Sequence, residues 1–127
     1  MLGRMSIALV VALAAGAAQA AETGNVARGK NLFGRTCDNC HSTQIGVNKI
    51  GPSLHAIVDR KAASVPDFVY SESMKANAGK GLAWSEQAIN DYLANPREVK
   101  HGVKMFFKGF PRARDRADVI AYLKTLK

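Results

Sequence analysis

The chain is short and strongly basic, with 127 residues and 18 lysines and arginines against 10 aspartates and glutamates. This length allows one small domain and excludes a second, and a domain of this size often recruits a disulfide, a metal or another core element. The net charge of +8 suits an acidic partner, which can be nucleic acid, an anionic lipid surface or an acidic protein face.

An export signal is predicted for residues 1–20. Arg4 makes the start basic, residues 7–18 are an unbroken run of apolar residues and glycine, and Ala-Gln-Ala ends at Ala20. The run is short for a membrane span, which needs about 20 apolar residues, although an uncleaved anchor stays open. We therefore expect a cleaved signal peptide, a mature domain at 21–127 and a location in the periplasm. Export argues against nucleic acid as the partner.

The mature part reads as helices and turns with no clear strand. Apolar or small residues recur at three- and four-residue steps from Val26, which predicts an amphipathic helix carrying the two cysteines at its C-terminal end. A loop marked by glycine and proline follows at 45–54, and then a short apolar turn at 56–58. The pattern predicts an all-α, single-domain protein.

Three further helices are expected. Ser71 can cap a short helix that runs through Met74, and Ser85 can cap a clearer one, which Pro96 ends because proline disfavours helix at the preceding residue. The last helix is expected from about Ala113 to Leu126, with an apolar stripe at Val119, Ile120, Leu123 and Leu126.

The two cysteines and a histidine form one motif, Cys37-Asp-Asn-Cys40-His41. Thiols at i and i+3 lie on one face of a helical turn, so a disulfide is possible in an oxidising compartment. A thioredoxin-like redox pair favours a βαβ setting and a structural zinc site usually takes four ligands, neither of which this chain offers. The motif favours covalent haem attachment, in which both thiols bind the porphyrin and His41 is directed at the iron.

A haem iron with a side chain in its sixth position passes electrons, whereas an open position binds gas or peroxide. The candidate sixth ligand is Met105, in the stretch HGVKMFFKGFP. A methionine beside two phenylalanines is also an ordinary core residue. However, the preceding segment, 97–104, is neither clearly helical nor strand-like, so Met105 is expected at the tip of a loop. Met74, the other methionine of the mature chain, has a helical setting.

The mature sequence resembles soluble class I c-type cytochromes of the mitochondrial and purple-bacterial type across nearly its whole length. GKNLFGRTCDNCH resembles their first helix, GPSLHAIVDRK the segment after the motif, YLANP the helix end before the sulfur ligand, and RADVIAYLK their last helix. The resemblance implies N- and C-terminal helices packed together around one haem c, with Val119 and Tyr122 facing Gly29 and Phe33.

The resemblance also implies a role for each remaining site residue. The Pro52 carbonyl would accept the second N–H of the His41 imidazole, which fixes the orientation of the ring. Arg60 would lie near a haem propionate, Tyr70 and Trp84 would donate hydrogen bonds to a propionate, and Tyr92 would lie near the sulfur ligand Met105.

Three features depart from the family pattern. The segment between Tyr70 and Trp84 is longer, which leaves the placement of a loop asparagine at Asn77 open. His101 stands where proline is common, and Val103 stands where a threonine usually bonds a propionate.

The resemblance implies a monomeric, mobile one-electron carrier rather than an enzyme, with His41 and Met105 as iron ligands. Its partners would be acidic faces of a quinol–cytochrome c reductase, a terminal oxidase, a photosynthetic reaction centre or a periplasmic dehydrogenase, with transient contact to a membrane surface. Steering towards such faces is expected from a basic ring of Lys30, Arg35, Lys49, Arg97, Lys104, Lys108 and Arg112. A haem peroxidase, a thiol oxidoreductase, a gas-binding protein and a haem-free structural domain stay open as rivals.

Overall fold

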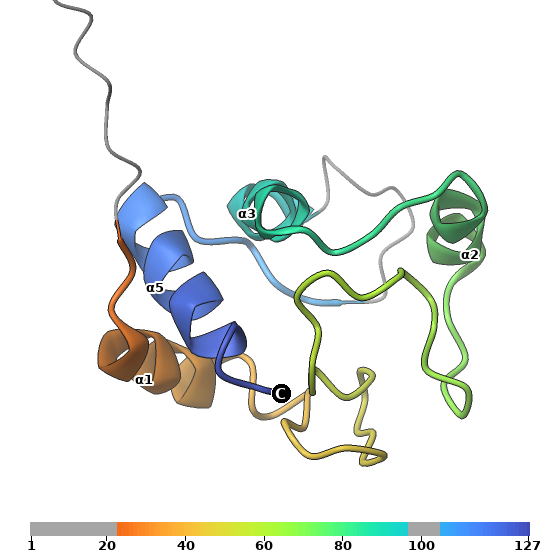
Figure 1. Ribbon diagram of the computed structural model, residues 1–127, viewed down its shortest axis with the longest axis horizontal. Helices are drawn as coiled ribbons and strands as arrows, with labels where there is room; N and C mark the ends of the chain where they lie inside the picture. The colour runs from red at the N-terminus through yellow and green to blue at the C-terminus, as the bar shows by residue number, and fades with distance from the viewer. Residues whose placement is uncertain (1–22, 97–104) are drawn as a thin grey trace, which may run out of the picture.

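The first and last helices pack against each other and form the largest contact between the helices that the structure describes. The computed structural model describes residues 23–96 and 105–127, so the expected signal peptide and the loop at 97–104 lie outside it. Helix α1 spans Val26–Thr36 and helix α5 spans Ala113–Leu123 (Figure 1). No helix in the two described ranges is long and apolar enough to cross a membrane.

The two helices cross at a glycine. A Cβ atom added at Gly29 would lie 2.5 Å from the carbonyl carbon of Asp118 and 3.0 Å from the Cβ of Tyr122. Four residues along α1, the ring of Phe33 meets the ring of Tyr122 edge-on, with 5.3 Å between the ring centroids. Val119 is almost completely buried in the same core. The expected pairing of Gly29 and Phe33 with the last helix is therefore present.

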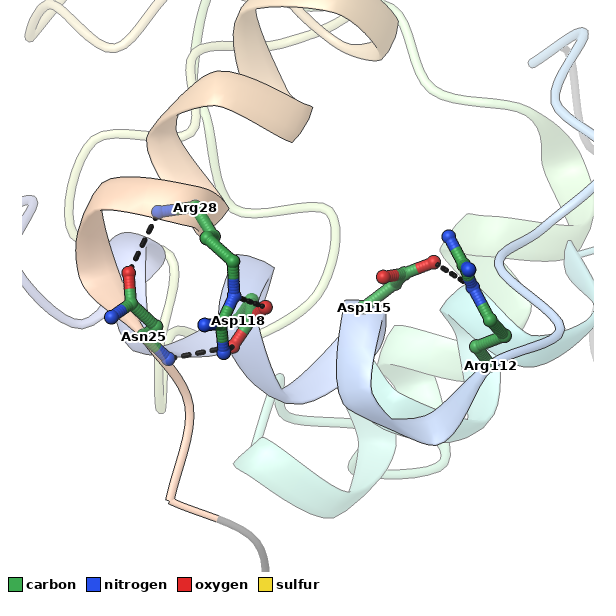
Figure 2. A network of polar contacts seen from close by, with 5 residues as sticks. All are labelled: Asn25, Arg28, Arg112, Asp115 and Asp118. Atoms are coloured by element: carbon green, nitrogen blue, oxygen red, sulfur yellow. Dashed lines mark hydrogen bonds and ion pairs between the residues drawn. The ribbon is translucent and has the colours of Figure 1, made fainter.

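A buried carboxylate ties the start of α1 to α5. The side chain of Asp118 is only 2 % exposed, and it accepts hydrogen bonds from Arg28 Nε at 2.8 Å and from the backbone N–H of Asn25 at 2.6 Å (Figure 2). Asn25 also caps α1, because its side-chain oxygen accepts the N–H of Arg28. A separate ion pair, Arg112–Asp115, lies in the first turn of α5 and does not reach α1.

Two serines cap the middle helices as expected. Ser71 Oγ accepts the N–H of Met74 at the start of α2, which spans Glu72–Gly79 and so runs five residues beyond its expected end at Met74. Ser85 Oγ accepts the N–H of Ala88 at the start of α3, which spans Glu86–Ala94. Helix α3 packs on α5, whereas α2 buries no residue and lies on the far side of the molecule from α1 and α5 (Figure 1).

Both terminal helices end earlier than their sequence patterns predict. Helix α1 stops at Thr36, so the cysteines follow it in a turn instead of lying on it. Helix α5 stops at Leu123, because Thr125 Oγ1 donates to the carbonyl of Tyr122 and the carbonyl of Leu126 accepts the N–H of Ala56. Contacts with the rest of the fold, which periodicity does not contain, set these ends.

The segment between the cysteine motif and α2 is irregular. Among the described residues the only β-type pairing is an isolated bridge between Lys61 and Ala83. Three non-glycine residues in this segment have left-handed backbone angles, namely Ala56, Asp59 and Ala63, with φ of 50°, 65° and 52°. Such angles cost an L-residue about 1–2 kcal/mol each, so this path is held by its surroundings.

Candidate functional site

One tight turn holds both thiols and the imidazole of the motif. The N–H of Cys37 donates to the carbonyl of Phe33 at the end of α1, and the N–H groups of Cys40 and His41 both donate to the carbonyl of Cys37, at 3.0 and 2.9 Å. The two cysteines are half-buried and free, and they are not joined to each other. The turn therefore presents two thiols and one imidazole from five consecutive residues.

The His41 ring is held between a carbonyl and a glycine. Its Nδ1 lies 2.7 Å from the carbonyl oxygen of Pro52. A Cβ atom added at Gly51 would lie 2.7 Å from Nδ1 and 2.9 Å from Nε2, so only glycine leaves room for the ring. The N–H of Gly51 donates to the carbonyl of Cys40 at 2.7 Å, which fixes this glycine against the motif.

The electrostatics of His41 suit a metal ligand. Burial lowers the pKa of its imidazole, and the hydrogen bond to the Pro52 carbonyl only partly opposes this shift. The ring is therefore neutral at pH 7, with the proton on the Nδ1 that faces the carbonyl. A neutral imidazole protonated at Nδ1 keeps the lone pair of Nε2 available to a metal.

The thiol of Cys37 has a raised pKa, whereas a redox-active thiol has a lowered one. Burial, assisted by the neighbouring Cys40 and Asp38, raises its pKa to about 11. Catalytic cysteines of CxxC enzymes have lowered pKa values because the thiolate is the reactive form. This pKa disfavours the thiol oxidoreductase that the sequence left open.

Within the described ranges, the guanidinium of Arg60 is hydrogen-bonded through its two terminal nitrogens but not through Nε. Its two terminal nitrogens donate to the carbonyls of His55 and Ser53, both at 2.9 Å. Its Nε is buried and has no hydrogen-bond partner among the described residues. Burial lowers the pKa of the guanidinium, and the nearby Tyr70 partly opposes this shift. A buried N–H of a cation requires an acceptor, and an anionic group is the best one.

Backbone pairing brings the expected aromatic residues to Arg60. The N–H of Trp84 donates to the carbonyl of Arg60, and the N–H of Asp59 donates to the carbonyl of Trp84, both at 2.8 Å. The rings of Trp84 and Tyr92 meet edge-on at 5.1 Å, and burial raises the pKa of Tyr92 to about 12. The hydroxyl of Tyr70 accepts the N–H of Val65, which leaves its own hydrogen free to donate.

Met105 begins a segment that is anchored to the end of α3. The N–H of Phe110 donates to the carbonyl of Leu93 at 2.7 Å, and the rings of Phe107 and Phe110 meet edge-on at 5.0 Å. Gly109 has a φ of +97°, and a Cβ atom there would lie 2.5 Å from the carbonyl oxygen of Ala94. Met105 itself is half-buried, and the residues before it lie outside the described ranges.

A family model described as Cytochrome c matches residues 26–127, which is most of the chain. The chain belongs to the cytochrome c family. It is 41% identical over 104 residues to a cytochrome c of Euglena viridis, with 82% of this chain and 99% of the relative covered. It is 40% identical over 107 residues to cytochrome c2 of Rhodopila globiformis, with 84% and 98% covered. Cytochrome c2 of Afifella marina is 42% identical over 101 residues, with 79% and 81% covered.

Membership confirms the resemblance to class I c-type cytochromes, their all-α fold and their cofactor. Cytochromes c carry electrons through one haem c that is bound covalently to each chain, and Cys37 and Cys40 fit the attachment motif. The residues present suit this cofactor. Gly51 leaves space against the His41 ring, and the buried Nε of Arg60 lacks the acceptor that a haem propionate would supply.

Two members of the expected basic ring are already paired in this cytochrome c. Lys49 donates to the backbone carbonyl of Asp38 at 2.5 Å and lies 3.6 Å from its carboxylate, and Arg112 pairs with Asp115. Arg97 and Lys104 lie outside the described residues. The other three, Lys30, Arg35 and Lys108, are exposed and form no ion pair with any residue that the structure describes.

Three residues of the site were missed from the sequence. Gly51 and Gly109 were missed because their close approaches involve distant parts of the chain. The glycine-proline pair in front of the SLH stretch was the available signal for Gly51. Ser53 is 3 % exposed, accepts from Arg60 through its carbonyl and donates from Oγ to the carbonyl of Gln44. Nothing in its sequence neighbourhood distinguishes it from a surface serine.

Proposed function

We propose that this chain is a soluble, periplasmic one-electron carrier that shuttles electrons between membrane or periplasmic redox complexes, with His41 and Met105 as the ligands of its haem iron. The observation that carries the proposal is the neutral His41 ring, placed directly after the two thiols and bonded to Pro52. The relatives named cytochrome c and cytochrome c2 support the same role.

His41 would be the ligand on one side of the haem. The Pro52 carbonyl holds the proton on Nδ1, so Nε2 is directed outward with its lone pair free. Gly51 prevents rotation of the ring, because its backbone lies directly against the imidazole. The ligand is thus oriented before any cofactor is bound, which reduces reorganisation when the charge on the iron changes.

Met105 would be the ligand on the other side. The hydrogen bond from Phe110 to the carbonyl of Leu93 and the close approach of Gly109 to Ala94 hold the chain that follows Met105. A thioether and an imidazole together favour the ferrous state and raise the reduction potential. When bound, the haem supplies the iron that accepts and releases one electron.

Arg60, Tyr70 and Trp84 would hold the haem propionates. Within residues 23–96 and 105–127, Arg60 has a buried Nε–H with no hydrogen-bond partner, and Tyr70 has a hydroxyl hydrogen that is left to donate. The N–H of Trp84 donates to the carbonyl of Arg60, and its ring meets that of Tyr92 edge-on. Tyr92 stays protonated at every physiological pH, so it would add a neutral, water-excluding wall near Met105.

Docking would depend on the unpaired cations. Lys30, Arg35 and Lys108 are exposed without an ion pair in the described ranges, so their charge is available to acidic faces of a quinol–cytochrome c reductase, a terminal oxidase, a reaction centre or a dehydrogenase. Lys49 and Arg112 contribute less, because each already neutralises a carboxylate. The export signal that the sequence predicts at residues 1–20 supports the periplasm as the place of action.

Visible spectroscopy of the protein made with haem-attachment machinery tests the proposal. We expect the mature mass to exceed that of the chain by one haem, and carbon monoxide to leave the reduced spectrum unchanged. Met105→Ala should abolish the methionine-to-iron charge-transfer band and admit carbon monoxide, whereas Met74→Ala, the matched control, should change neither. A wild-type protein that binds carbon monoxide would indicate an open iron site and contradict the carrier.

A further inference from the structure

The loop after the haem-attachment motif presents an apolar surface to solvent. Ile45 is 77 % exposed, Ile50 is 79 % exposed, and Val47 between them is 42 % exposed. The large hydrophobic side chains exposed in the described ranges number six, and half of them fall within these six positions. Scattered exposed apolar residues need no explanation, but a cluster on one loop indicates a contact surface.

This loop is rigid. Both backbone polar groups of Gln44 are bonded, because its N–H donates to Ser42 Oγ at 3.0 Å and its carbonyl accepts from Ser53 Oγ at 2.6 Å. The side chain of Asn48 accepts the N–H of Ser53, and the N–H of Lys49 donates to the carbonyl of Gly51. A loop fixed in this way loses little conformational entropy when a partner covers it.

The outer surface of the loop carries no free charge. Lys49 is the only charged residue between His41 and Pro52, and its ammonium group is bound to Asp38. An uncharged apolar tip is thus set on a chain of net charge +8. That charge opposes contact between two copies of the chain, which disfavours a dimer through this surface.

The loop is joined directly to the haem-attachment turn. Gly51 bonds to the carbonyl of Cys40, and Lys49 bonds to Asp38 between the two cysteines. Whatever covers Ile45 and Ile50 is therefore connected through this loop to the two cysteines that would attach the haem. Membrane-surface anchors typically include tryptophan or tyrosine, and this loop has neither.

We infer that Ile45, Val47 and Ile50 form an apolar docking surface for a redox protein, which binds them with an uncharged, apolar depression at the centre of an acidic face. This inference rests on the proposed function and names the kind of partner. The apolar contact adds affinity that does not depend on salt, whereas Lys30, Arg35 and Lys108 steer the approach. Recognition then has a polar rim and an apolar centre, as in other protein interfaces.

The test measures oxidation of the reduced protein by a purified bacterial cytochrome c oxidase and its reduction by a purified quinol–cytochrome c reductase, both in detergent. Ile45→Ser/Ile50→Ser should raise KM about tenfold with at least one of the two, which corresponds to about 1.4 kcal/mol of binding free energy lost by the pair. The slope of KM against ionic strength should stay as in the wild type. Val69→Ser, at a valine 75 % exposed outside the loop, is the matched control and should leave KM unchanged.

Equal KM values for the loop variant and Val69→Ser would overturn the inference. So would a loop variant that loses only its binding to phosphatidylglycerol–phosphatidylethanolamine vesicles, because the loop would then contact a membrane. If the double variant fails to fold, Ile45→Ser alone should raise KM about threefold. A wild type that binds haem and exchanges electrons with neither complex would contradict the proposed function itself.

Discussion

Replacing Gly29 by alanine should separate the two terminal helices. The added Cβ would lie 2.5 Å from the carbonyl carbon of Asp118 and closer still to its oxygen, whereas real Cβ atoms essentially never come within 3.0 Å of such atoms. The obstructing group is backbone in the middle of α5, so no side chain can move aside. The helices must therefore separate by more than about 0.5 Å, a form of overpacking that costs about 1–3 kcal/mol.

The separation also weakens the contacts on both sides of the crossing. The ring contact between Phe33 and Tyr122 and the hydrogen bonds of Asp118 both span the same two helices. Alanine gains about 1 kcal/mol of helix propensity over glycine, which offsets part of the loss. We expect Gly29→Ala to lower the free energy of unfolding by about 2 kcal/mol, and the melting temperature by about 10 °C.

Gly34 is the matched control, because it lies in the same helix with nothing within 4 Å of its added Cβ. Gly34→Ala should therefore stabilise the protein by up to about 1 kcal/mol through helix propensity alone. Guanidinium and thermal denaturation of the haem-bound protein, followed by far-UV circular dichroism, would measure both changes. Equal changes of the same sign in the two variants would refute the assignment of the crossing to Gly29.

Three further changes follow from particular residues. Hydrogen bonds from Arg28 lower the pKa of the Asp118 carboxyl. Its contribution to stability is therefore present above the unfolded pKa of about 4 and is lost as pH falls through the folded value. Asp118→Asn should cost about 2 kcal/mol at pH 7 in urea denaturation, and the gap should close towards pH 2. Ala63→Gly should raise stability by about 1 kcal/mol in the same assay, because φ is +52°; no gain would mean that this backbone is unstrained. Rising pH should replace Met105 by a nitrogen ligand from its loop, at lower pH than in a His101→Pro/Val103→Thr variant, as followed by the charge-transfer band.

Capping residues next to each helix predicted where the helices start, whereas the helix ends that the sequence placed wrongly depend on contacts with distant parts of the chain. Ser71 and Ser85 cap their helices because a side-chain oxygen needs only the N–H groups of the next turn. The end of α5 depends on the bond between Leu126 and Ala56, 70 positions away along the chain, and periodicity contains no such information. The same distinction explains why the start of each of these helices was placed better than its end.

In the candidate site, too, some features could be predicted from the sequence and others depend on contacts between distant residues. The motif and the family resemblance named His41 and Pro52, and the structure places their atoms 2.7 Å apart. Neither could show that Gly51 lies against the ring, because that contact depends on the path of the loop. A list of basic residues also could not show that Lys49 turns inward onto Asp38, since pairing depends on where the loop returns.

The crossing of α1 and α5 also decides when the fold can close. The ion pair between Arg28 and Asp118 joins positions 90 residues apart, and closing so long a loop costs about 4 kcal/mol of chain entropy. Helix α1 therefore has no packing partner among the described helices until α5, near the other end of the chain, has formed. Cys37 and Cys40 directly follow α1, so their thiols stay accessible for as long as the last helix is missing. The order of residues along the chain thus leaves an interval in which haem can be attached before the two ends meet.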